Sequence, residues 1–264
     1  MITDRVDAVA ELLAGAERDG IAVRQPEVPL SIDEAYAVQT RSLRGREARG
    51  ERQVGVKLGF TSRAKMAQMG IDDVIVGFLT DAHHVGDGGD LSLAGLIHPR
   101  VEPEVAFRLA RDVDTTDPAD DLVSAVDAVA PALEIIDSRY RDFRFSLPAV
   151  IADNTSAARF AVGPWAPLPA DLGDLDVVLE VDGTAAASGS TSAILGHPLE
   201  ALRELRRMAE RYGHRLRAGS VILAGAATAA VPMPTTGVVT ARVAGLGEVG
   251  VRVVGGARGG GVDG

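Results

Sequence analysis

The chain contains no cysteine among its 264 residues, which excludes disulfide bonds and thiolate metal ligands. It also lacks any apolar run near the ~18 residues that a membrane-spanning helix needs. Its first residues have neither the basic start nor the apolar block of a signal peptide. We therefore expect a cytoplasmic protein without a membrane anchor.

Basic residues are the minority among the charged ones, with 27 Lys and Arg against 37 Asp and Glu and a net charge of −10. A nucleic-acid surface needs clustered positive charge, so nucleic acid is not an expected partner. An anionic substrate would need a bound cation or local arginines. With 46% apolar residues, the chain can build one large core, with or without a small N-terminal lobe.

Two helices are predicted near the N-terminus. Apolar residues recur at helical spacing over residues 3–18. Ser31 and Glu34 fit a capping box that begins a second helix, which should end before Gly50. Together these segments predict a helical N-terminal lobe over residues 1–53.

From Val54 the pattern changes to short strands and glycine-rich turns. The predicted strands cover residues 54–60, 101–110, 131–137, 176–182, 220–224, 237–244 and 248–254. Two further helices are predicted, one after Asp117-Pro118 and one from Pro198 to a stop at Gly213. Because strands outnumber helices without regular βαβ alternation, we predict a strand-rich α+β domain over residues 54–254, followed by a disordered tail over 255–264.

Three glutamates are the most informative residues. Glu102 and Glu104 flank Pro103, and residues two apart on a strand point to the same side, with Cα atoms roughly 6.5–7 Å apart. A solvated strand face is one interpretation of this pair. Glu134, however, lies in an apolar run, where an unpaired carboxylate is costly. Three carboxylates without cysteine favour Mg²⁺ or Mn²⁺ over zinc.

Other polar residues are candidates for substrate contacts. Lys57, inside an apolar strand, either reaches the surface or binds a substrate carboxylate or moves a proton. Arg139 could fork onto a substrate carboxylate or pair with a nearby aspartate. Asp153 and Asn154 belong to a polar cluster that is either a helix cap or a set of hydrogen-bonding groups for a ligand.

Two patterns point away from alternative sites. Residues 245–250 match G-x-G-x-x-G, but strand-like residues stand on both sides, so we predict a hairpin turn and no nucleotide site. His83 and His84 are adjacent and would point to opposite faces of a strand, so no histidine ligand is expected.

Several segments resemble the hydratase/decarboxylase branch of the fumarylacetoacetate hydrolase superfamily. Their order and spacing match over about residues 35–254, in segments 55–62, 100–104, 131–139, 152–154, 195–198 and 245–247. The resemblance implies a mixed β-roll or barrel-like core of the fumarylacetoacetase C-terminal type. It also implies Mg²⁺ or Mn²⁺ held by Glu102, Glu104 and Glu134, with Lys57 lining the pocket and Thr228 near the substrate.

Within this branch, segments 62–66 and 140–148 are most similar to enzymes that decarboxylate 2-oxohex-3-enedioate to 2-hydroxypenta-2,4-dienoate in meta-cleavage aromatic catabolism. The resemblance implies a small 2-oxo dicarboxylate substrate, a homo-oligomer, and association with a 2-hydroxypenta-2,4-dienoate hydratase subunit. The alternatives are that hydratase activity itself, an acylpyruvate-type C–C hydrolase, and a non-catalytic partner subunit. Segments 83–84 and 231–234 depart from the family and could change the shape of the pocket.

Overall fold

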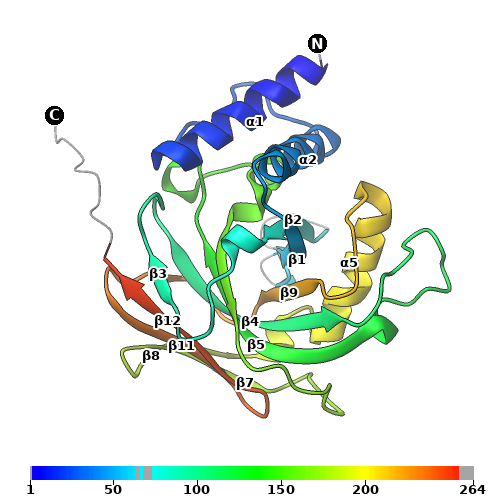
Figure 1. The fold of residues 1–264 in the computed structure, drawn as a ribbon, viewed down its shortest axis with the longest axis vertical. Helices are drawn as coiled ribbons and strands as arrows, with labels where there is room; N and C mark the ends of the chain where they lie inside the picture. The colour runs from blue at the N-terminus through cyan, green and yellow to red at the C-terminus, as the bar shows by residue number, and fades with distance from the viewer. Residues whose placement is uncertain (1, 64–65, 68–72, 256–264) are drawn as a thin grey trace.

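The computed structural model describes residues 2–63, 66–67 and 73–255, arranged as two β-sheets flanked by helices (Figure 1). Apart from Gly255, the tail that we predicted to be disordered lies outside the described residues. The strand-rich mixed α+β architecture agrees with the prediction from the sequence.

The two N-terminal helices, α1 (Ile2–Asp19) and α2 (Ile32–Ala48), lie together at one end of the molecule (Figure 1). The predicted capping box is present, since Ser31 Oγ accepts from the Glu34 backbone N–H and the Glu34 carboxylate accepts from the Ser31 backbone N–H. Buried residues of both helices share one apolar cluster with the strand that follows. The helices are therefore packed onto the sheet.

The larger sheet has seven strands and mixed polarity. In spatial order these are β2 (Ile75–Thr80), β1 (Gln53–Gly59), β9 (Val221–Ala226), β4 (Arg100–Leu109), β5 (Val126–Ile136) and β6 (Ala157–Val162), with β10 (Val231–Pro232) paired to β4. Beyond β2 the chain returns to β6, where His84 bridges to Phe160 and the Val85 N–H donates to the Phe160 carbonyl. The sheet therefore curls until its two ends approach each other.

The smaller sheet has five strands and covers one outer face of the larger one. Its spatial order is β3 (Asp90–Ser92), β12 (Gly247–Val254), β11 (Gly237–Val243), β7 (Asp176–Val181) and β8 (Thr184–Ser190). An apolar cluster joins the sheets, with Val101 and Leu133 on one side and Leu179 and Val251 on the other. The G-x-G-x-x-G segment joins antiparallel β11 and β12, which confirms the predicted hairpin turn.

The remaining helices include α4 (Leu147–Ala152) and α5 (Pro198–Tyr212). The predicted stop of α5 is confirmed, because Gly213 adopts a left-handed conformation with φ 73°. The helix predicted after Asp117-Pro118 is wrong. This segment forms turns and a short 3₁₀ helix (Val123–Ala125), and β5 begins directly afterwards at Val126.

Aspartate side chains explain the missing helix. Carboxylates of Asp114, Asp117 and Asp121 accept N–H groups two or three residues further along the chain. Such local bonds compete with helix formation. Apolar residues that follow this segment, Val126 and Val129 among them, lie in β5 and pair with β4.

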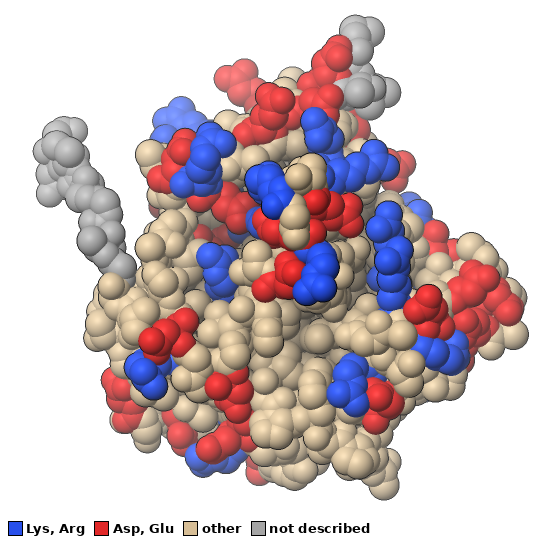
Figure 2. All heavy atoms as spheres, in the orientation of Figure 1, with Lys and Arg blue, Asp and Glu red and all other residues tan. Residues whose placement is uncertain are grey.

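On the face shown in Figure 2, basic and acidic side chains are interspersed, most densely over the N-terminal helices. No helix formed by the described residues has both the length and the apolar character needed to cross a membrane.

Candidate metal centre and substrate cavity

Strand alternation and register bring the three glutamates together. Glu102 and Glu104 share one face of β4, while Val101 and Val105 on the other face are fully buried in the apolar clusters. In the antiparallel pair of β4 and β5, Glu102 lies directly opposite Glu134. One carboxylate oxygen from each glutamate lies within 4.8 Å of the others.

Lys57 extends from β1 to the same place. Its Nζ lies 2.9 Å from Glu134 Oε2 and donates to the Thr155 carbonyl at 3.2 Å. In the antiparallel pair of β1 and β2, Lys57 lies opposite Gly77. A Cβ on residue 77 would lie only 2.8 Å from the Asn154 carbonyl oxygen and 3.2 Å from Lys57 Cδ. Glycine at this position makes room for both the lysine and the chain at Asn154.

The four charges strongly perturb one another. Burial raises the pKa of Glu104 well above its ordinary value, and repulsion from Glu134 adds to this effect, with Lys57 opposing it. Burial alone would lower the pKa of Lys57, but the carboxylates of Glu134, Glu104 and Glu102 outweigh it and raise the pKa. The cluster carries more negative charge than Lys57 can balance.

The residues present fit a hard divalent cation. Glu104 Oε2 accepts from the Gly225 N–H at 2.8 Å, whereas Glu104 Oε1 and Glu134 Oε1 have no hydrogen-bond partner within the described part of the chain. Buried oxygens without partners are costly, and a cation would satisfy them. An all-oxygen donor set suits Mg²⁺, Mn²⁺ or Ca²⁺.

A cavity of about 190 Å³ opens beside the glutamates. Its polar lining consists of Lys57, Thr61, Ser62, Glu102, Thr155 and Ser156. Its larger apolar lining residues are Leu58, Phe60, Ile75, Ile136, Phe143, Phe145 and Val150. The cavity is thus mostly apolar with a few polar groups, which is typical of a site for a small molecule.

The polar side of the cavity includes an unusual turn. Asn154, Thr155 and Ser156 are consecutive non-glycine residues with φ of 49°, 54° and 57°. Single residues visit this left-handed region only occasionally, and such strain gathers at functional sites. The hydroxyls of Thr155 and Ser156 are buried and have no hydrogen-bond partner among the described residues. They are available to a ligand in the cavity.

Arg139 contacts both ends of this turn, at Asp153 and at Ala157. Its guanidinium pairs with the Asp153 carboxylate and donates to the Asp153 carbonyl, at one end of the turn. It also donates to the Ala157 carbonyl at 3.1 Å, at the other end. The Asn154 side chain bonds to both backbone groups of Phe78 in β2. The turn is therefore fastened on both sides.

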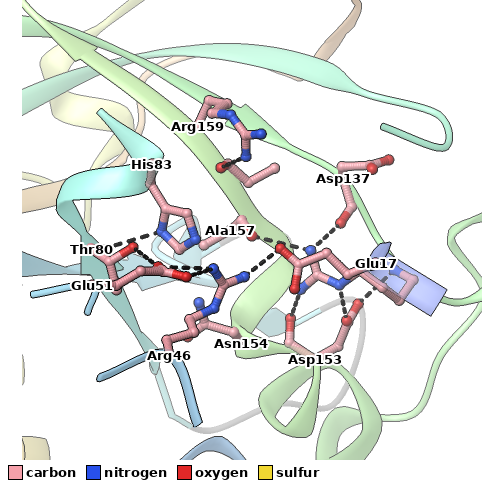
Figure 3. A network of polar contacts seen from close by, with 12 residues as sticks. Glu17, Arg46, Glu51, Thr80, His83, Asp137, Asp153, Asn154, Ala157 and Arg159 are labelled. Carbon is pink, nitrogen blue, oxygen red and sulfur yellow. Dashed lines mark hydrogen bonds and ion pairs between the residues drawn. The ribbon is translucent and has the colours of Figure 1, made fainter. Parts of the chain in front are cut away.

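The same network reaches the N-terminal helices. Arg46 of α2 bridges Glu17 of α1 and Glu51, and Glu51 accepts from the Thr80 hydroxyl at 2.7 Å (Figure 3). Burial alone would raise the pKa of Glu17, but Arg139 and Arg46 together lower it. These contacts connect α1 and α2 electrostatically to the Arg139–Asp153 ion pair that contacts the turn.

The structure separates the candidate residues into two groups. Lys57 and the three glutamates converge at the first cavity. Arg139, Asp153 and Asn154 line a second cavity, also about 190 Å³, beneath α1 and α2. Thr228 lines neither of these two cavities, and its hydroxyl donates to the Ala229 carbonyl.

Sequence reasoning did not single out Thr155, Ser156, Phe143 and Phe145 as cavity residues. The only signal was their membership in the polar cluster after residue 152 and in the segment after Arg139. Their positions depend on backbone conformations with positive φ, including that of Phe143 at 53°. The local sequence of neither segment predicts these conformations.

Comparison with known proteins identifies the fold. The profile of the fumarylacetoacetate (FAA) hydrolase C-terminal family matches residues 52–254. The chain belongs to the fumarylacetoacetate hydrolase family. Within it, a 4-oxalocrotonate decarboxylase of Pseudomonas sp. is 47% identical over 231 residues, which cover 87% of this chain and 90% of that relative.

Other members of the family extend the comparison. A 2-keto-4-pentenoate hydratase of Paraburkholderia xenovorans (strain LB400) is 37% identical, over 83% of each chain. The structure of 4-oxalocrotonate decarboxylase from Pseudomonas putida G7, complexed with magnesium and adipate, superposes with a TM-score of 0.88. The two sequences are 38% identical, and the match covers 96% of this chain and 98% of the chain in that structure.

Proposed function

We propose that this protein is a divalent-metal-dependent carboxy-lyase that converts 2-oxohex-3-enedioate to 2-hydroxypenta-2,4-dienoate and CO₂. The observation that carries the proposal is the buried cluster of Glu102, Glu104 and Glu134 beside a small, mostly apolar cavity. The 47% identity to a 4-oxalocrotonate decarboxylase supports the choice of reaction.

The three glutamates would hold Mg²⁺ or Mn²⁺. When bound, the cation supplies Lewis-acid stabilisation of negative charge on the 2-oxo acid end of the substrate. In the reaction, the C5–C6 bond breaks and C6 leaves as CO₂. The electron pair moves through the conjugated chain to the C2 oxygen, which gives a dienolate, and protonation of that oxygen gives the product.

The chain's own residues would position the substrate and manage the proton. Lys57 is the cation among the described residues that line the cavity, and its protonated Nζ is the candidate donor to the C2 oxygen. The unpartnered hydroxyls of Thr155 and Ser156 can donate to substrate oxygens. The apolar wall excludes water and favours departure of a carboxylate as neutral CO₂.

The test is an incubation of the purified protein with Mg²⁺ and 2-oxohex-3-enedioate, with CO₂ and dienol both measured. We expect release of CO₂ in step with loss of substrate. No CO₂, together with hydration of 2-hydroxypenta-2,4-dienoate, would replace the proposal with the hydratase reaction of the 37% identical relative. A homo-oligomer and a hydratase partner remain predictions of the family resemblance.

A further inference from the structure

The proposed substrate carries a second carboxylate, and the cavity does not offer an obvious partner for it. Lys57 pairs with Glu134 and donates to the Thr155 carbonyl, and its third donor is the one assigned to the C2 oxygen. Arg139, the sequence-based candidate, is bound to Asp153 and lines the other cavity. Lys57 is the cation among the described residues that line the first cavity, and most of the other lining residues are apolar. A dianionic ligand there needs another cation.

Strand geometry places Arg100 in the row of the metal-site glutamates. On β4, Arg100, Glu102 and Glu104 alternate and so project from the same face. Directly opposite Arg100 on β5 is Ile136, which lines the cavity, just as Glu134 lies opposite Glu102. Arg100 therefore extends the row by one step, from the glutamates towards the solvent.

The surroundings of Arg100 leave its charge available. Its guanidinium carbon lies 5.2 Å from the ring centre of Phe143, a cavity-lining residue. Its side chain is exposed, and within the described part of the chain it forms neither an ion pair nor a hydrogen bond. Stacking on an aromatic ring orients the planar guanidinium while leaving its donors free.

We propose that Arg100 binds the distal carboxylate and thereby selects dicarboxylates over monocarboxylates of the same length. The inference rests on the proposed function, in which the head of the substrate lies at the glutamates. The spacing of roughly 6.5–7 Å between Cα atoms of alternate strand residues is comparable to the length of a six-carbon chain. A guanidinium can receive a carboxylate with two parallel hydrogen bonds.

The chemistry of the reaction predicts how this contact acts. The distal carboxylate is lost as neutral CO₂, so its attraction to Arg100 weakens as the reaction proceeds. Removing an interaction that is stronger in the bound substrate than in the transition state raises KM and also raises kcat, by the part of the interaction that the transition state has lost. Arg100 is therefore a specificity residue, and its removal should raise KM while kcat rises slightly.

The experiment compares two ligands that share the 2-oxo acid head and differ at C6, 2-oxoadipate and 2-oxohexanoate. Calorimetry with the Mg²⁺-loaded protein measures both affinities without turnover. R100Q should weaken 2-oxoadipate binding about ten-fold and leave 2-oxohexanoate binding unchanged. Equal effects on both ligands, or none, would overturn the proposal.

Arg141 provides a matched control. It is exposed and lies in the same short turn as Phe143, but its guanidinium donates to the Ala22 carbonyl. R141Q should keep the wild-type preference for 2-oxoadipate. A loss of preference equal to that of R100Q would show a general charge effect and overturn the assignment.

The outcome is separable from that of the proposed function. If the wild type releases no CO₂ from 2-oxohex-3-enedioate but R100Q loses the dicarboxylate preference, the decarboxylase reaction fails and Arg100 stands. If the wild type releases CO₂ and R100Q keeps the preference, the reaction stands and the assignment of Arg100 fails.

Discussion

Replacing Arg139 with methionine removes the cation that contacts both ends of the left-handed turn beside the first cavity. Arg139 is 6% exposed and Asp153 is 1% exposed, so water screens this ion pair little. The change leaves a buried carboxylate without its main partner and removes the guanidinium donors to the carbonyls of Asp137, Asp153 and Ala157. It leaves the side chains that line the first cavity unchanged.

The expected loss is large because breaking a buried ion pair by removing one partner costs about 3–5 kcal/mol. Typical domains have free energies of unfolding of about 5–15 kcal/mol, so the variant should be markedly less stable. The turn also supplies the carbonyl that accepts from Lys57, so kcat should fall as well. Arg41→Met is the control, because Arg41 pairs with Asp7 at the surface and should cost about 0–1 kcal/mol.

The pH dependence gives a second signature. Burial raises the pKa of Asp153 to about 6, and Arg139 opposes this rise. Without Arg139 the pKa should rise further, while in the unfolded chain it stays near 3.8. The folded variant then binds a proton more tightly than the unfolded chain does, so its stability falls as the pH rises through this interval.

Urea unfolding at pH 6 and pH 8 measures both effects. From pH 6 to pH 8, R139M should lose up to about 1.4 kcal/mol per pH unit relative to the wild type. Adding Asp153→Asn to R139M should remove this extra slope. The reasoning is refuted if R139M loses less than about 1 kcal/mol and follows the wild-type pH dependence.

Three further predictions test the site and the core. Lys57→Met should lower kcat by about 10²–10⁴-fold, because Lys57 acts on the substrate, while the Mn²⁺ dissociation constant should change by a smaller factor. Steady-state kinetics and a Mn²⁺ titration measure the two quantities. Unchanged kinetics would show that Lys57 has only a structural role. EDTA should abolish activity and added Mg²⁺ or Mn²⁺ should restore it, whereas activity that survives exhaustive chelation contradicts a metal role. Burial lowers the pKa of His83 from 6.5 to about 3 in the folded protein. Between these two pH values only the unfolded chain binds the proton, so the free energy of unfolding decreases as the pH falls from 6.5 towards 3. Between pH 7.5 and pH 5.5 this should cost about 1.4 kcal/mol in urea unfolding; His83→Asn should lose that much less than the wild type, and exposed His84→Asn serves as the control. Equal slopes in H83N and the wild type would contradict this prediction.

The convergence of the glutamates could be predicted because it follows from local rules. The alternation of charged and apolar residues around Glu102 and Glu104 sets a strand and its two faces. The apolar run around Glu134 identifies a second buried strand, and a buried carboxylate needs a partner. What the local pattern did not contain was the register, which places Glu102 opposite Glu134.

The partner of Arg139 could not be predicted in the same way. The sequence offered nearby aspartates and a substrate carboxylate as alternatives, and the structure gives Asp153, which follows a separate helix. Strand β8 was missed because Thr184–Ser190 consists mostly of Ala, Ser and Gly, with one β-branched residue and no aromatic residue to indicate a strand. In both cases tertiary contacts decide what local preference leaves open.

The left-handed turn is the part of the site farthest from sequence reasoning. Asn154, Thr155 and Ser156 include no glycine, and of the three residue types only asparagine favours positive φ. The conformation is held by Arg139 and by the bonds of Asn154 to β2, both of which join residues distant in sequence.

The most direct test of the central claim is a titration of Mn²⁺ into the metal-free protein, followed by electron paramagnetic resonance. We expect one tight site per chain in the wild type. Glu104→Gln should weaken it by about 100-fold or more, with an unchanged circular dichroism spectrum, because the glutamine carbonyl can still accept from the Gly225 N–H. Wild-type Mn²⁺ affinity in E104Q would contradict the assignment of the glutamate cluster as the metal site.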